Sequence, residues 1–193
     1  MNNTMNKKIG ILAGAVASMM LSVPSHAADD VHPQILDVAM KHVIIETKKP
    51  YADVCAFIEG KLGRLDQPMR DMMQNGQTDQ LRESAARIIK NYGLSIHYIA
   101  YHGKVLALNG PTENLKTYYI GDILSASTMT RVIRPAGLYA PLRAVIYQNA
   151  SGGTTIEYDQ PSSLFGQFHN PTTDAMGVSL DERMGKLMHD AAS

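Results

Sequence analysis

The sequence predicts an α+β fold in which helices pack on one face of an antiparallel sheet. Apolar residues recur at helical spacing in residues 51–62, 78–92 and 172–188, whereas most of residues 95–159 read as short strands separated by turn signals. Helices and antiparallel strands grouped in this way along a chain are typical of an α+β domain.

The first two predicted elements are a strand and a helix. Residues 42–47 (HVIIET) form a β-branched run of strand length, which ends before Pro50. Proline is favoured in the first turn of a helix, and Gly63 is well placed to end one. One face of this helix carries the apolar residues Tyr51, Val54, Cys55, Ile58 and Leu62.

Residues 64–92 are predicted to be helical. A short methionine-rich helix around Pro68 is broken at Asn75 and Gly76, and Thr78 caps a second helix. Gly93 can end that helix in the left-handed conformation.

Strands follow the insertion. Residues 95–101 and 104–108 are predicted to pair as a hairpin around His102 and Gly103. Further elements are expected at residues 115–120 (strand), 125–134 (helix), 142–148 and 154–159 (a hairpin), 161–168 (short helix) and from 172 or 173 onward (final helix).

Residues 1–27 resemble a signal peptide. Lys7 and Lys8 precede an apolar run at residues 9–23, and the small residues Ser25 and Ala27 fit a signal peptidase site. The run has about 15 residues and is shorter than the roughly 20 needed to cross a bilayer, so we expect no membrane span. We therefore predict cleavage after Ala27 and a periplasmic location.

Residues 28–193 are expected to form a single domain. Cys55 is the one cysteine of the 193 residues, so no disulfide can form within the molecule and the fold must be held by its core. The chain has 18 basic and 18 acidic residues, which gives no global attraction to nucleic acid or to an anionic membrane.

Several segments together resemble the DUF302 family of bacterial and archaeal domains of unknown function. They are HVIIETKKPYADVCAFIEGKLGRLD, YHGKVLALNG, YYIGDIL, GLYAPLRAVIYQ and GGTTIEYDQPSSLFGQF. The resemblance covers about residues 41–188, with the helical insertion at about 64–92. It implies a TATA-binding-protein-like β-α-β4-α arrangement and is compatible with a homodimer, but it implies no reaction, cofactor or catalytic residue. Asp122 and Ile123 stand where many members have Asn-Pro, so we expect a local change in that turn.

The sequence lacks the familiar catalytic and cofactor motifs. It has no G-x-S-x-G elbow, no P-loop and no H-x-x-x-H spacing of metal ligands, so no metal, cofactor or catalytic residue is predicted. The enzyme alternative is a metal-dependent or thiol redox enzyme that uses His97, His102 or Cys55. Cys55 is interpreted first as a core residue, because it lies on an apolar stripe and cysteine is among the most buried residue types.

The leading hypothesis is a non-enzymatic binding or accessory domain for a small, mostly apolar molecule. The chain has nine tyrosines, and most of them lie on or beside predicted strands, where they could line one concavity with hydroxyls for orientation. Arg143 and Asp159 could pair with each other or contact a polar group of a ligand. The candidate ligand-binding residues are Tyr98, His102, Tyr139, Arg143, Tyr158 and Asp159.

Overall fold

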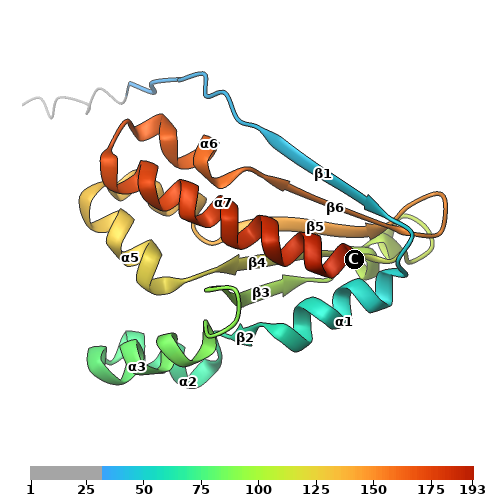
Figure 1. The fold of residues 1–193 in the computed structure, drawn as a ribbon, viewed down its shortest axis with the longest axis horizontal. Helices are drawn as coiled ribbons and strands as arrows, with labels where there is room; N and C mark the ends of the chain where they lie inside the picture. Colours follow the sequence, from blue (N-terminus) through green and yellow to red (C-terminus); the bar gives the residue numbers. More distant parts are fainter. Residues whose placement is uncertain (1–31) are drawn as a thin grey trace, which may run out of the picture. The chain divides into compact units, whose positions relative to one another are not determined.

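A six-stranded sheet organises the chain in the computed structural model, which describes residues 32–193 (Figure 1). The strand order is β1-β6-β5-β4-β3-β2, and neighbouring strands are antiparallel except for β2 and β3. The strands are β1 (His42–Thr47), β2 (Gly63–Arg64), β3 (Ser95–Ala100), β4 (Leu115–Gly121), β5 (Leu142–Gln148) and β6 (Thr154–Asp159).

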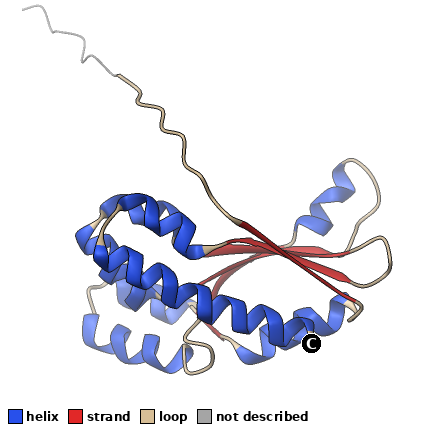
Figure 2. Cartoon of the chain, turned by 45° about the horizontal axis from the view of Figure 1, so that its top comes forward, coloured by secondary structure: helices blue, strands red, loops and turns tan. Residues whose placement is uncertain are grey.

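Most of the helices gather on one side of this sheet (Figure 2). The longest helix, α7 (Pro171–Ala192), contacts α1, α5, α6 and β1. The other α-helices are α1 (Tyr51–Lys61), α2 (Gln67–Gln74), α3 (Thr78–Ile88), α4 (His102–Val105), α5 (Ile123–Val132) and α6 (Pro161–Phe165). Three 3₁₀ segments are η1 (Leu106–Leu108), η2 (Arg134–Tyr139) and η3 (Gly166–Phe168). The predicted α+β class is therefore confirmed.

The alternation of side chains along the strands separates the core from the uncovered face of the sheet. On β5, Leu142, Ala144 and Ile146 are buried in the core together with residues of α1 and α7. Arg143 and Val145 point to the opposite face, because successive strand residues alternate between the two faces. The core thus lies between the helices and one face of the sheet.

Helices α2 and α3 pack around a small cluster of their own. Buried Leu65, Met69 and Ala85 form its centre, with half-buried Ile123 and Leu124 from the start of α5 packed against it. Asp66 caps α2 by accepting a hydrogen bond from the Met69 amide. The two helices thereby contact the N-terminal turn of α5.

The predicted hairpin around His102 and Gly103 is wrong. Residues 102–108 form α4 and η1, and β3 pairs instead with β4, which begins at Leu115. Gly103 is buried against the returning chain, where an added Cβ would lie 2.0 Å from the Glu113 carbonyl oxygen. A run of five apolar and polar residues is too short to distinguish a strand from a helix, and this close chain contact is a property of the tertiary structure.

The hairpin of β5 and β6 is confirmed, with Gly152 at a positive φ of 84° in its turn. Gly93 also has a positive φ, of 64°, although α3 already ends at Ile88. In the part of the chain that the structure describes, no helix combines the length and apolar character needed to cross a membrane. The predicted signal peptide at residues 1–27 lies outside the described residues.

Candidate functional site

A cavity of about 140 Å³ lies where β3, β4 and β5 meet α5, α6, α7 and η2. Its walls are mainly apolar, as is usual for small-molecule sites. The lining residues are His97, Gly121, Asp122, Ile123, Ser125, Ala126, Met129, Tyr139, Ala140, Pro141, Leu142, Phe165 and Leu180.

His97 reaches this cavity because the register of β3 against β4 shifts between Ile96 and Tyr98. Such a bulge inserts an extra residue and re-aims its side chain. The Nε2 atom of His97 is buried and has no hydrogen-bond partner among the described residues. Leaving a buried polar atom unpaired costs about 1–3 kcal/mol, so such an atom needs an explanation.

The electrostatic surroundings keep His97 neutral at pH 7. Burial lowers the pKa of its imidazole below the ordinary value, and the Arg70 guanidinium lowers this pKa further. The Gly121 carbonyl and the Asp122 carboxylate act in the opposite direction but do not reverse the shift. Arg70 also donates a hydrogen bond to the backbone oxygen of His97 at 2.7 Å, which ties the bulge to α2.

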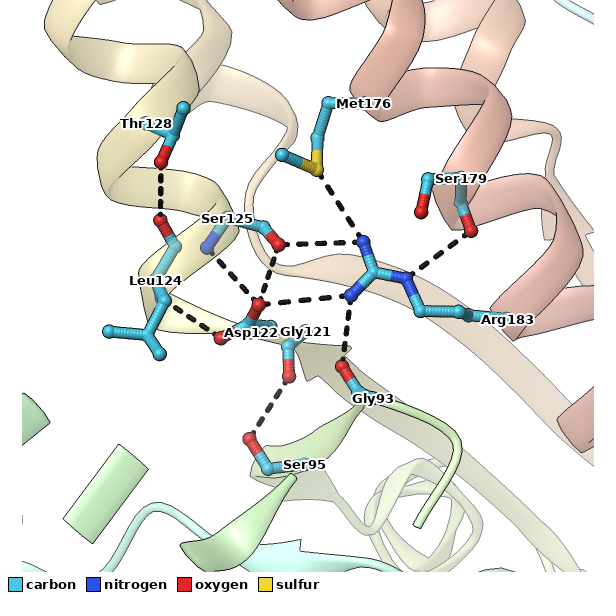
Figure 3. A network of polar contacts seen from close by, with 10 residues as sticks. All are labelled: Gly93, Ser95, Gly121, Asp122, Leu124, Ser125, Thr128, Met176, Ser179 and Arg183. Atoms are coloured by element: carbon cyan, nitrogen blue, oxygen red, sulfur yellow. Dashed lines mark hydrogen bonds and ion pairs between the residues drawn. The ribbon is translucent and has the colours of Figure 1, made fainter. Parts of the chain in front are cut away.

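The N-terminus of α5 forms the polar end of the cavity. Asp122 is its N-cap, and its carboxylate accepts hydrogen bonds from the Leu124 and Ser125 amides at 2.9 and 3.1 Å. The Ser125 hydroxyl also donates to Asp122 (Figure 3). These bonds use the free amides that would otherwise attract an anion to this helix end.

Arg183 of α7 completes the charge balance around Asp122. Its guanidinium lies 3.7 Å from the carboxylate and donates to the backbone oxygens of Gly93 and Ser179. Figure 3 shows the Arg183 head group between α5, α7 and the Gly93 loop. The Arg183 guanidinium thus binds other groups of the protein, and Arg183 is not among the residues that line the cavity.

The aromatic wall comes from η2 and α6. The rings of Tyr139 and Phe165 meet edge to face with centroids 6.3 Å apart, and Phe165 is fully buried. The Tyr139 hydroxyl donates to the Gln167 side chain at 3.4 Å. The cavity therefore has aromatic walls in addition to its polar groups at His97 and at the start of α5.

Among the six candidate ligand-binding residues, Tyr139 lines this cavity. Arg143 and Asp159 line a separate cavity of about 20 Å³, which Tyr139 also touches. Asp159 forms an ion pair with His42 at 2.8 Å. In the described part of the chain, no ion pair joins Arg143 to Asp159.

The other three candidates lie elsewhere. Tyr98 is 62% exposed and its ring packs against Tyr119 with centroids 5.6 Å apart. His102 is exposed at the start of α4. Tyr158 is buried in the core, and burial raises the pKa of its hydroxyl, with the nearby charge of Asp181 adding to the shift.

The three residues of the enzyme alternative are not gathered in one place. Only His97 among them lines the cavity. Cys55 is 4% exposed in the core, as its position on the apolar stripe predicts. Within residues 32–193, no group of three or more His, Cys, Asp and Glu side chains is placed to hold a metal ion.

Cys55 borders a polar group that we call the Glu59 cluster: Glu59, Arg64, Lys116 and Tyr118. Glu59 accepts hydrogen bonds from Lys116 at 2.8 Å, Tyr118 at 2.7 Å and Arg64 at 3.0 Å. Burial by itself raises the pKa of Glu59, but the bonds from Lys116 and Tyr118 outweigh it and lower this pKa below its usual value. Burial also raises the pKa of Tyr118, and the adjacent Cys55 thiol contributes to that shift.

Sequence reasoning missed Asp122, Ser125 and Phe165, and it considered His97 only for the enzyme alternative. The D-x-x-S pattern at Asp122 and Ser125 matches a helix N-cap and could have placed the polar end of a helix there. Nothing in the sequence marks the bulge at His97 or the closeness of Phe165.

Comparison with known proteins assigns the class of fold and then the family. A crystal structure of an uncharacterized conserved DUF302 protein from Bacillus stearothermophilus matches with a TM-score of 0.56 and 15% identity, covering 80% of this chain and all of that one. The model of the DUF302 family, a domain of unknown function, matches residues 70–191. The chain therefore belongs to the DUF302 family. A search of the curated proteins found no match.

Proposed function

We propose that this protein is a non-enzymatic binding domain for a small, mostly apolar molecule, held in the cavity beside His97. The observation that carries the proposal is a cavity of about 140 Å³ with mainly apolar walls, lined by His97, whose buried Nε2 has no hydrogen-bond partner among the described residues. A ligand with one polar group would satisfy this atom and fill the apolar space. Accessory action on a partner protein would then depend on whether the cavity is occupied.

Native mass spectrometry of the purified protein tests this function. We expect a retained small molecule, or a rise in melting temperature when cell extract is added. The variant Ala126→Leu should lose both effects, because Ala126 lines the cavity and leucine would fill it. Ala126→Met provides a second filling variant if leucine prevents folding. A wild-type protein that behaves like these variants would refute the function.

The enzyme alternative, with His97, His102 or Cys55, has a direct test. Metal analysis of protein isolated without chelators should find less than one equivalent of transition metal if the binding function is correct. One bound equivalent that is lost in His97→Leu would favour the enzyme.

Export is part of the proposal, and it is supported by the signal-peptide pattern at residues 1–27. Protein recovered from the periplasmic fraction should begin at Ala28. A chain that keeps Met1 and stays in the cytoplasm would refute this part.

A homodimer is also proposed, with the uncovered face of the sheet as the contact. Ile44 on β1 and Tyr98 on β3 are 59% and 62% exposed on this face, and a second copy of the chain would cover them. Light scattering should give twice the chain mass. Ile44→Lys should dissociate the dimer, and a wild-type monomer would refute it.

A further inference from the structure

The cavity beside His97 has the size of one six-membered ring. An engineered cavity of about 150 Å³ lined by apolar side chains binds benzene, and this cavity has about 140 Å³. Met129, Leu142 and Leu180 supply aliphatic walls, and Tyr139 and Phe165 supply aromatic ones. A single ring fits this space.

The charges around the cavity select against an anion. No Lys or Arg is among the described residues that line it, and the Asp122 carboxylate is. The Leu124 and Ser125 amides at the start of α5 already donate to Asp122, so these two offer no bond to a bound carboxylate or phosphate.

The same surroundings also disfavour a cation. The Asp122 carboxylate is saturated by two amides, the Ser125 hydroxyl and the adjacent Arg183 guanidinium. A second cation beside Asp122 would face the positive charge of Arg183 at close range. A neutral ligand avoids both penalties.

The remaining polar requirement is one hydrogen bond at His97 Nε2. In a neutral imidazole this nitrogen either donates or accepts, depending on the tautomer. A hydroxyl group can meet either case because it both donates and accepts. An ether only accepts and a hydrocarbon does neither, so a hydroxyl is the most suitable partner.

We infer that the ligand is a neutral single-ring alcohol of the phenol type, with its hydroxyl on His97 Nε2 and its ring against Tyr139 and Phe165. The inference rests on the proposed binding function and specifies its ligand class. The ligand needs no charged group and no metal. Cavity volume and wall composition lead to a single ring, and the unpaired nitrogen of His97 leads to the hydroxyl.

Calorimetric titration of the purified protein with phenol, benzene and benzoate tests the inference. We expect phenol to bind about tenfold more tightly than benzene, which corresponds to one hydrogen bond to an otherwise unpaired buried group. Benzoate should bind at least about tenfold more weakly than phenol, because its charge meets Asp122.

Three variants locate the effect. His97→Leu should remove the preference for phenol over benzene, and Ala126→Leu should abolish binding of both. His102→Leu is the matched control, because His102 is an exposed histidine outside the cavity, and it should leave all affinities unchanged. Equal binding of phenol and benzene by the wild type would overturn the ligand class and leave the binding cavity standing. Tighter binding of benzoate than of phenol would overturn the class as well. Failure of both phenol and benzene to bind would also overturn the class, whereas the proposed function is decided by the separate experiment with cell extract and the Ala126 variants.

Discussion

The Glu59 cluster and the His97 cavity are two polar regions at the same sheet, and they differ in whether their polar atoms are paired. Glu59 receives hydrogen bonds from three side chains, and the buried Tyr118 hydroxyl is one of the donors. His97 Nε2 is buried without a partner in the described structure. A region whose polar atoms satisfy one another is complete by itself and serves the fold. A region with an unpaired atom beside an apolar cavity has room for a ligand.

The largest expected effect concerns access to the Glu59 cluster. Cys55 lies beside this cluster and is 4% exposed, so a thiol reagent should modify it only when the protein opens. For an ordinary folding free energy of at least 5 kcal/mol, labelling should be roughly 10³-fold or more slower than in the urea-unfolded chain. Stopped-flow or colorimetric thiol titration measures this ratio.

A matched control is the double variant Cys55→Ala and Ser151→Cys. Ser151 is exposed in the turn between β5 and β6, so its thiol should react at nearly the unfolded rate. Rapid labelling of native Cys55 would show that the Glu59 cluster is open to small molecules. The cluster would then no longer differ from the His97 cavity in having no room for a ligand.

The next effect is the loss of stability when the Glu59 cluster loses its acceptor. Glu59→Ala removes the carboxylate that accepts hydrogen bonds from the buried Tyr118 hydroxyl and from Lys116, and it should lower the free energy of unfolding by about 2–3 kcal/mol. Urea denaturation measures the change. Glu113→Ala, at an exposed position outside the cluster, should stay within about 0.5 kcal/mol of the wild type. If Glu59→Ala matches this control, the cluster contributes nothing to the fold.

His97→Leu should act in the opposite direction. It removes an unpaired polar atom and keeps most of the side-chain volume, so the free energy of unfolding should rise by about 1 kcal/mol. The same urea experiment on His102→Leu should show a change within about 0.5 kcal/mol. A loss of more than about 1 kcal/mol in His97→Leu would mean that this imidazole supports the fold as Glu59 does.

His97 and His42, a histidine on the uncovered face, should change the folding stability in opposite directions as pH varies. The folded pKa of His97 is lowered, so the unfolded chain binds more protons and stability falls as pH drops below about 6.5 toward that lowered value. The folded pKa of His42 is raised, first by the hydrogen bond to Asp159 and then by that to Glu157. The His42 pairs therefore contribute to the free energy of unfolding below about pH 6.5, and this contribution is lost as pH rises through the raised pKa of His42.

The smallest expected effect follows from the opposite pKa shifts of these two histidines. His42 is half exposed, so its pairs contribute less than about 1 kcal/mol. His42→Gln should lower stability at pH 6 but not at pH 9, and His97→Leu should remove part of the loss between pH 6.5 and 5. Thermal denaturation across this range measures both. Identical pH profiles for the two variants would contradict the opposite environments of the two histidines.

Much of the fold could be predicted because its elements depend on local patterns. The stripe from Tyr51 to Leu62 predicts α1, and the turn residues between β5 and β6 predict that hairpin. The burial of Cys55 also follows from its place on the stripe. The run at residues 104–108 was predicted wrongly: it is helical, and the preceding Gly103 lies against Glu113 from farther along the chain, a contact that a local pattern does not reveal.

The candidate site was predictable only in part. Tyr139 was expected to bind a ligand and does line the cavity, whereas Arg143 and Tyr98 lie outside it. The strand pattern could place tyrosines on the sheet but could not say which of them meet across elements. The partners Asp122 and Arg183 are separated in the chain by every element from α5 to η3 and by the first half of α7, so no spacing rule connects them.

The sequence by itself determined the α+β class, the pattern of buried strand and helix faces, and the resemblance to DUF302. These depend on periodicity and turn chemistry, which act between near neighbours in the chain. Only the tertiary structure decided that His97 sits on a bulge with its nitrogen unpaired, and that α5, α6 and α7 leave a ring-sized space beside it. The physical reason is that a cavity is the space left between side chains of separate elements, and its volume depends on how those elements pack against each other.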